Sequence, residues 1–122
     1  MQKNEFGAML KRLADSWTSR EYESVAGHFA DRVFYSEALN YTFRDVRSLL
    51  QFFQDDGGKP PTCEFHNWIF EEDRQLGVVE FSFQGTYAYH GTVWIEIAHD
   101  KIACWREYQH MSEKTREEFW QR

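Results

Sequence analysis

The chain has 122 residues, of which 42% are hydrophobic and 18% aromatic, and its formal net charge at pH 7 is −6. This length suits one domain, residues 1–122, with a core of its own. An acidic chain repels phosphate backbones, so nucleic acid is not expected as a partner. No stretch approaches the roughly 20 apolar residues of a membrane span. The N-terminus also lacks the apolar run of a signal peptide, so we expect a cytoplasmic protein without a membrane partner.

The first half of the chain has the hydrophobic spacing of helices. Apolar residues recur every three or four positions over residues 4–17, which predicts an amphipathic helix. A capping-box pattern that begins at Thr18 predicts a second, short helix, which continues to Ala30. A similar pattern at Thr42 predicts a third helix, whose apolar face carries Phe43, Val46, Leu49, Leu50 and Phe53.

The second half has the composition of strands, rich in aromatic and β-branched residues. Strands are predicted at 62–71, 76–87, 91–98 and 101–110. Short connections make sequential strands antiparallel, so these should form a meander. The tight turn at 98–100 should hold Asp100 in the left-handed conformation, and Ser112 should cap a final helix at 113–121. Helices that cover one face of such a sheet define an α+β fold.

Three segments resemble the nuclear transport factor 2 superfamily, in particular its SnoaL-like bacterial members. These segments are His28–Val33, Phe81–Val93 and Asp100–Tyr108. The resemblance implies a cone, in which a strongly curved antiparallel sheet wraps around the N-terminal helices and leaves a cavity. It also implies a homodimer that packs through the convex face of the sheet. The superfamily includes ketosteroid isomerase, polyketide cyclases and non-catalytic binders, so the fold alone does not define a function.

Glu37, His66 and Glu107 are the candidate catalytic residues. The resemblance to ketosteroid isomerase places Glu37 where that enzyme carries its carboxylate base. A carboxylate in an apolar pocket is poorly solvated and can move protons near neutral pH, and Glu107 could supply a second one. The plainer alternative is that Glu37 ends an exposed strand and Glu107 forms an ion pair. Leu13 and Val93 stand where ketosteroid isomerase carries its hydrogen-bond donors, so steroid isomerisation is not expected.

The inward orientation of His66 depends on the length of one turn. A two-residue turn at Asp73-Arg74 would direct His66 and Trp68 into the cone. A turn longer by one residue would direct Phe65, Asn67 and Ile69 inward instead. A histidine beside a buried carboxylate could shuttle protons, whereas a structural or exposed histidine is the alternative.

Aromatic side chains are expected to line the cavity. The candidate ligand-binding residues are Trp17, Tyr35, Phe53, Trp68, Phe81, Phe83 and Trp105. No cofactor or metal is expected, because the histidines are scattered and no glycine-rich nucleotide loop occurs. These features favour a protein that binds a small hydrophobic ligand. One alternative is a cofactor-free isomerase, cyclase or dehydratase with Glu37 as general base. The other is a non-catalytic dimeric interaction module whose own aromatic residues fill the cavity.

Overall fold

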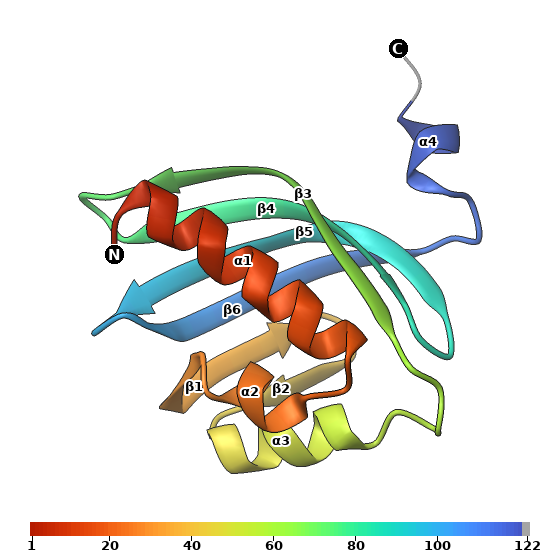
Figure 1. Ribbon diagram of the computed structural model, residues 1–122, viewed down its shortest axis with the longest axis horizontal. Helices are drawn as coiled ribbons and strands as arrows, with labels where there is room; N and C mark the ends of the chain where they lie inside the picture. The colour runs from red at the N-terminus through yellow and green to blue at the C-terminus, as the bar shows by residue number, and fades with distance from the viewer. Residues whose placement is uncertain (121–122) are drawn as a thin grey trace.

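Four helices and one six-stranded sheet make up the computed structural model, which describes residues 1–120. The helices are α1 (Lys3–Thr18), α2 (Tyr22–Ala26), α3 (Val46–Gln54) and α4 (Arg116–Phe119). The strands are β1 (Phe29–Glu37), β2 (Tyr41–Phe43), β3 (Thr62–Glu71), β4 (Leu76–Gln84), β5 (Ala88–Ala98) and β6 (Lys101–Met111). The curved sheet has the order β2-β1-β6-β5-β4-β3, and α1 crosses its concave face (Figure 1). This arrangement confirms the predicted α+β cone.

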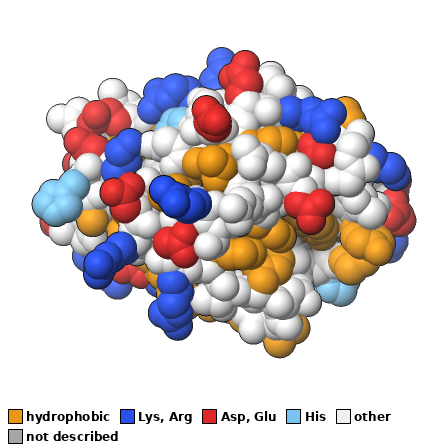
Figure 2. Space-filling model, turned by 90° about the horizontal axis from the view of Figure 1, so that it is seen from below, with side chains coloured by type: hydrophobic (Ala, Val, Ile, Leu, Met, Phe, Trp, Pro, Cys, Tyr) orange, Lys and Arg blue, Asp and Glu red, His pale blue; other side chains and the backbone are white. Residues whose placement is uncertain are grey.

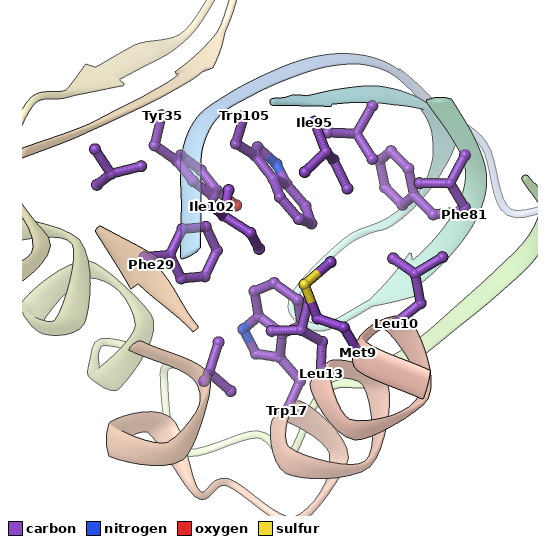
Figure 3. Packing of buried hydrophobic residues seen from close by; sticks show 14 of the residues in the cluster. Met9, Leu10, Leu13, Trp17, Phe29, Tyr35, Phe81, Ile95, Ile102 and Trp105 are labelled. Atoms are coloured by element: carbon purple, nitrogen blue, oxygen red, sulfur yellow. The ribbon is translucent and has the colours of Figure 1, made fainter. Parts of the chain in front are cut away.

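The apolar stripe of α1 fills the concave side of the sheet. All five residues that carry the predicted helical spacing are buried: Phe6, Met9, Leu10, Leu13 and Trp17. Their spacing places them on one side of the helix, where they meet the inward-facing side chains of the strands (Figure 3). Helix α1 therefore forms one wall of the space between helices and sheet.

The predicted antiparallel meander from β3 to β6 is confirmed, although the β5–β6 turn differs from expectation. Residues 72–75 connect β3 and β4, as the predicted strand bounds imply, and Glu71 pairs with Leu76 in the register that a turn at Asp73-Arg74 gives. The backbone N–H of Gln75 donates to the Glu72 carbonyl across this turn at 3.2 Å. The β5–β6 turn contains only His99 and Asp100, with φ of 51° and 60°, which suits a two-residue hairpin. A register shift next to this turn then offsets the strands, so that Val93 lies opposite Glu107. A three-residue turn at 98–100 predicts Val93 opposite Trp105, so the observed register differs by two residues and the same side chains still face inward.

The boundaries around β1 and β2 were predicted wrongly. Phe29 begins β1 and is not the end of a helix, and Thr42 and Phe43 lie in β2, which pairs with β1. Asp45, not Thr42, is the N-cap of α3, where its carboxylate accepts the backbone N–H of Ser48 at 2.8 Å. These segments pair with neighbouring strands, and such tertiary pairing overrides local helical patterns. Strand β1 also runs parallel to β6, which the meander did not predict.

The ends of the last elements also differ from the predicted boundaries. Strand β4 ends at Gln84, and β5 begins at Ala88, three residues earlier than predicted. The N-cap of α4 is Thr115 and not Ser112, and the helix ends at Phe119; residue 121 of the predicted helix lies outside the described residues. No helix within residues 1–120 is both long and apolar enough to cross a membrane.

Candidate functional site

A cavity of about 300 Å³ lies between the concave face of the sheet and the N-terminal helices. Six of the seven predicted ligand-binding residues line it: Trp17, Tyr35, Phe53, Phe81, Phe83 and Trp105. The Tyr35 and Trp105 rings stack with their centroids 5.4 Å apart, and Trp17 meets Trp105 at 5.8 Å from the helical side (Figure 3). Such a lining suits an apolar or aromatic ligand.

Glu107 is the buried carboxylic acid of the cavity. Its side chain points inward from β6, only 5% of the residue is exposed, and it accepts the indole N–H of Trp105 at 2.9 Å. Burial raises the pKa of Glu107 to about 7, and the negative charge of Glu37 adds to this effect, whereas the hydrogen bonds from Trp105 and Tyr35 oppose it. A carboxyl group with this pKa exchanges protons near neutral pH.

Three tyrosines and one cysteine surround Glu107 in the same cavity. Tyr35, Tyr41 and Tyr89 all line it, and burial raises the pKa of each hydroxyl, with a further contribution from the charge of Glu107. Burial also raises the pKa of the Cys63 thiol. These four groups therefore stay protonated at neutral pH, and the tyrosines can donate hydrogen bonds to a ligand.

One edge of the cavity is formed by the loop between α3 and β3. Asp56 in this loop accepts two hydrogen bonds from the guanidinium of Arg20, at 2.8 and 2.9 Å, and one from the Tyr22 hydroxyl at 2.5 Å. The bond from Tyr22 is the largest cause that lowers the pKa of Asp56. Residue Gly57 approaches Thr86 in the β4–β5 turn, so the two loops meet beside the cavity. Hydrophobic side chains also reach the surface on the α3 side of the molecule (Figure 2).

Glu37 is buried beside Glu107 but does not line the cavity. It is the last residue of β1, faces inward with Val33 and Tyr35, and is 3% exposed. Glu107 is its register partner on β6, and the backbone N–H of Leu39 donates to its carboxylate at 3.2 Å. Glu37 lines a separate hollow at the end of β1. The structure therefore brings Glu37 and Glu107 together, with Glu107 as the one that lines the cavity.

His66 points out of the cone, contrary to the inward orientation that a two-residue turn would give it. A β-bulge between Phe65 and Trp68 lets His66 and Asn67 both face outward, while the residues on either side face inward. Nε2 of His66 lies 2.8 Å from the Ser82 hydroxyl on the outer face. Within residues 1–120, no group of three or more histidine, cysteine, aspartate or glutamate side chains is arranged to hold a metal ion.

One candidate ligand-binding residue does not line the cavity, and several residues that line it were not predicted. Trp68 faces inward as predicted, but it packs against Phe6, at a centroid distance of 5.5 Å, and does not line the cavity. Tyr41 and Tyr89 also line the cavity and were missed, and Phe65, which lines it too, was placed inward only by the alternative with a longer turn. Tyr89 has the inward alternation of Val93 and could have been found by extending β5 towards the N-terminus. The position of Phe65 depends on the bulge, for which the sequence has no local signal.

No protein-family model and no curated protein matches the sequence. The fold is nevertheless shared with solved structures, among them a protein described as NTF2-like and one described as having a cystatin-like fold. The sequence resemblance is thereby confirmed at the level of the fold.

Three of these structures show how far the likeness extends. A protein of unknown function with a cystatin-like fold from Methylobium petroleophilum has a TM-score of 0.80 at 10% identity, over 95% of this chain and 82% of that one. An LEH-like epoxide hydrolase of M. tuberculosis has a TM-score of 0.74 at 12% identity, over 84% and 80%. An NTF2-like protein of unknown function from Cytophaga hutchinsonii has a TM-score of 0.71 at 4% identity, over 84% of this chain and 87% of that one. At such identities the likeness establishes the fold and not an activity.

Proposed function

We propose that this protein binds a small, largely aromatic or apolar molecule in the cavity, with a polar group of the ligand directed at Glu107. The observation that carries this proposal is the cavity of about 300 Å³ with an aromatic lining and, among the described residues that line it, one buried carboxylic acid. Sites for small molecules typically combine an apolar lining with a few polar groups that orient the ligand. An interaction module with a core filled by its own aromatic residues would leave no such space.

Filling the cavity should abolish this binding. Cys63→Phe introduces a ring at a buried position of the cavity wall, so we expect 2-naphthol, an aromatic probe with one hydroxyl group, to bind the parent and not the variant. Binding can be followed by calorimetry. Glu64→Phe is the matched control, because the Glu64 side chain is 77% exposed on the same strand. Failure of the parent to bind, or equal binding by Cys63→Phe, would contradict the proposal.

A second candidate is cofactor-free isomerase, cyclase or dehydratase chemistry in the same cavity. The pKa of about 7 of Glu107 favours it, because a general acid or base works best when its pKa is near the operating pH. Glu107 takes the proton-transfer role that the sequence suggested for Glu37, since Glu107 lines the cavity and Glu37 supports it through its charge. Under this candidate, Glu107→Gln abolishes turnover while 2-naphthol still binds.

We also propose a two-fold homodimer through the convex face of the sheet. Ile69, Trp94 and Tyr108 point outward there and are 69%, 40% and 51% exposed. Large apolar side chains exposed on one face of a sheet are often covered by a partner, and a self-complementary patch produces a two-fold dimer. We expect a dimer by sedimentation at tens of micromolar and a monomer for Trp94→Glu. Tyr87→Glu adds the same charge beside the cavity and should stay dimeric; a monomeric parent would refute the dimer.

A further inference from the structure

The charges around the cavity are unevenly distributed. Among the described residues that line it, Glu107 is the charged group in the buried part, whereas Asp55, Asp56 and Lys59 lie in the loop at its edge. Arg20 already pairs with Asp56. Glu37 adds a second buried carboxyl group on the neighbouring strand β1, where it is paired with Glu107. The inner part of the cavity is therefore a site of negative potential without a cationic side chain of its own among these residues.

The rings that line the cavity together with this carboxyl group also favour a positive charge. They include Trp17, Tyr35, Phe53 and Trp105. An aromatic ring carries partial negative charge on its face, so a cluster of rings attracts a cation more strongly once the cation loses its water. Because Trp105 donates its N–H to Glu107 at 2.9 Å, the carboxyl group is held as an acceptor at one end of this cluster.

From this arrangement we infer that the ligand is a small organic ammonium ion, bound among the aromatic rings with its charge beside Glu107. The inference rests on the proposed function, since it names the class of ligand that the same cavity accepts. A carboxylic acid ligand would meet the repulsion of Glu107 and Glu37. A neutral ligand would leave a charged Glu107 buried without a counter-ion, which costs free energy. A quaternary or tertiary ammonium group satisfies both the carboxylate and the rings.

The protonation of Glu107 should make the affinity for an ammonium ion depend on pH. The groups that face Glu107 are Glu37 and Tyr35 on β1, Tyr41 on β2, Cys63 on β3, Tyr89 on β5 and Trp105 on its own strand. The raised pKa values of the tyrosines and of Cys63 keep these groups protonated below about pH 8.5. A cation prefers the charged form of Glu107, so protons compete with it. Its affinity should therefore fall about tenfold per pH unit below pH 7.

Two probes of the same shape test the inference. Phenyltrimethylammonium and tert-butylbenzene differ in the replacement of a nitrogen cation by carbon, and the quaternary nitrogen does not titrate. We expect calorimetry on the full chain, between about pH 5.5 and 8.5, to show that the cation binds at least tenfold more tightly than the hydrocarbon at the upper end. This preference should vanish at the lower end. Glu107→Gln should bind both probes alike at every pH, whereas the exposed control Glu64→Gln should behave like the parent.

The outcomes separate this inference from the proposal on which it rests. Binding of tert-butylbenzene without a preference for the cation overturns the ammonium ligand and leaves the binding cavity standing. A cation affinity that does not change with pH, or that survives in Glu107→Gln, also overturns it. Absence of binding by both probes and by 2-naphthol overturns the cavity as a binding site and the inference with it.

Discussion

Replacing Glu107 with glutamine is expected to stabilise the protein by about 3 kcal/mol at pH 8 and to change its stability little at pH 4. The pKa of Glu107 is about 7 in the folded protein, above its ordinary value of 4.5, because the side chain is buried. The folded state therefore retains a proton that the unfolded chain releases between these values. Between these two pKa values, each rise of one pH unit lowers the free energy of unfolding by about 1.4 kcal/mol. This loss of stability is absent below pH 4.5 and complete above pH 7. It does not occur in the variant, because glutamine does not titrate.

Urea denaturation of parent and variant across this pH range measures the effect directly. Glutamine retains an oxygen that can accept the Trp105 N–H, so the packing around it is conserved. Glu64→Gln removes an exposed carboxylate from β3 and should leave the pH profile close to that of the parent. A difference between Glu107→Gln and the parent that does not grow as the pH rises would show that Glu107 is not a buried acid with a raised pKa.

Trp105→Ala should destabilise the fold by about 4 kcal/mol, within the range for removal of a large buried aromatic side chain. Trp105 is 2% exposed and contacts the rings of Trp17, Phe29, Tyr35 and Phe65, so its loss leaves a cavity that several elements share. It also removes the N–H donor of Glu107. The free energy of unfolding from urea denaturation gives the magnitude.

Two further variants make the Trp105 prediction specific. Trp94→Ala removes the same side chain from the adjacent strand, but Trp94 is 40% exposed, so we expect a loss of about 1 kcal/mol or less in protein dilute enough to be monomeric. Trp105→Phe keeps most of the packing and removes the donor, so it should fold even if the alanine variant does not. Its expected loss is about 1–2 kcal/mol. Equal losses for Trp105→Ala and Trp94→Ala would contradict the role of Trp105 in the cavity wall.

The position of the candidate site could be predicted only in part from the sequence. Alternation along β4 and β6 grouped the side chains by face, because alternation is a property of each strand alone. The resemblance to ketosteroid isomerase then placed Phe81, Trp105 and Glu107 inside the cone, where the structure has them buried. The choice between Glu37 and Glu107 could not be made in this way. Both face inward, and only the curvature of the sheet and the placement of the helices leave open space at Glu107.

The sequence by itself determined the elements whose hydrophobic spacing is local, namely α1 and the meander from β3 to β6. Tertiary structure decided the parallel pairing of β1 with β6, which sets Glu37 beside Glu107, and the bulge that directs His66 outward. Parallel pairing joins segments far apart in the chain, so no short window of sequence contains it. A bulge shifts the strand by one residue and reverses every side chain beyond it, and its position depends on how both strands pack together.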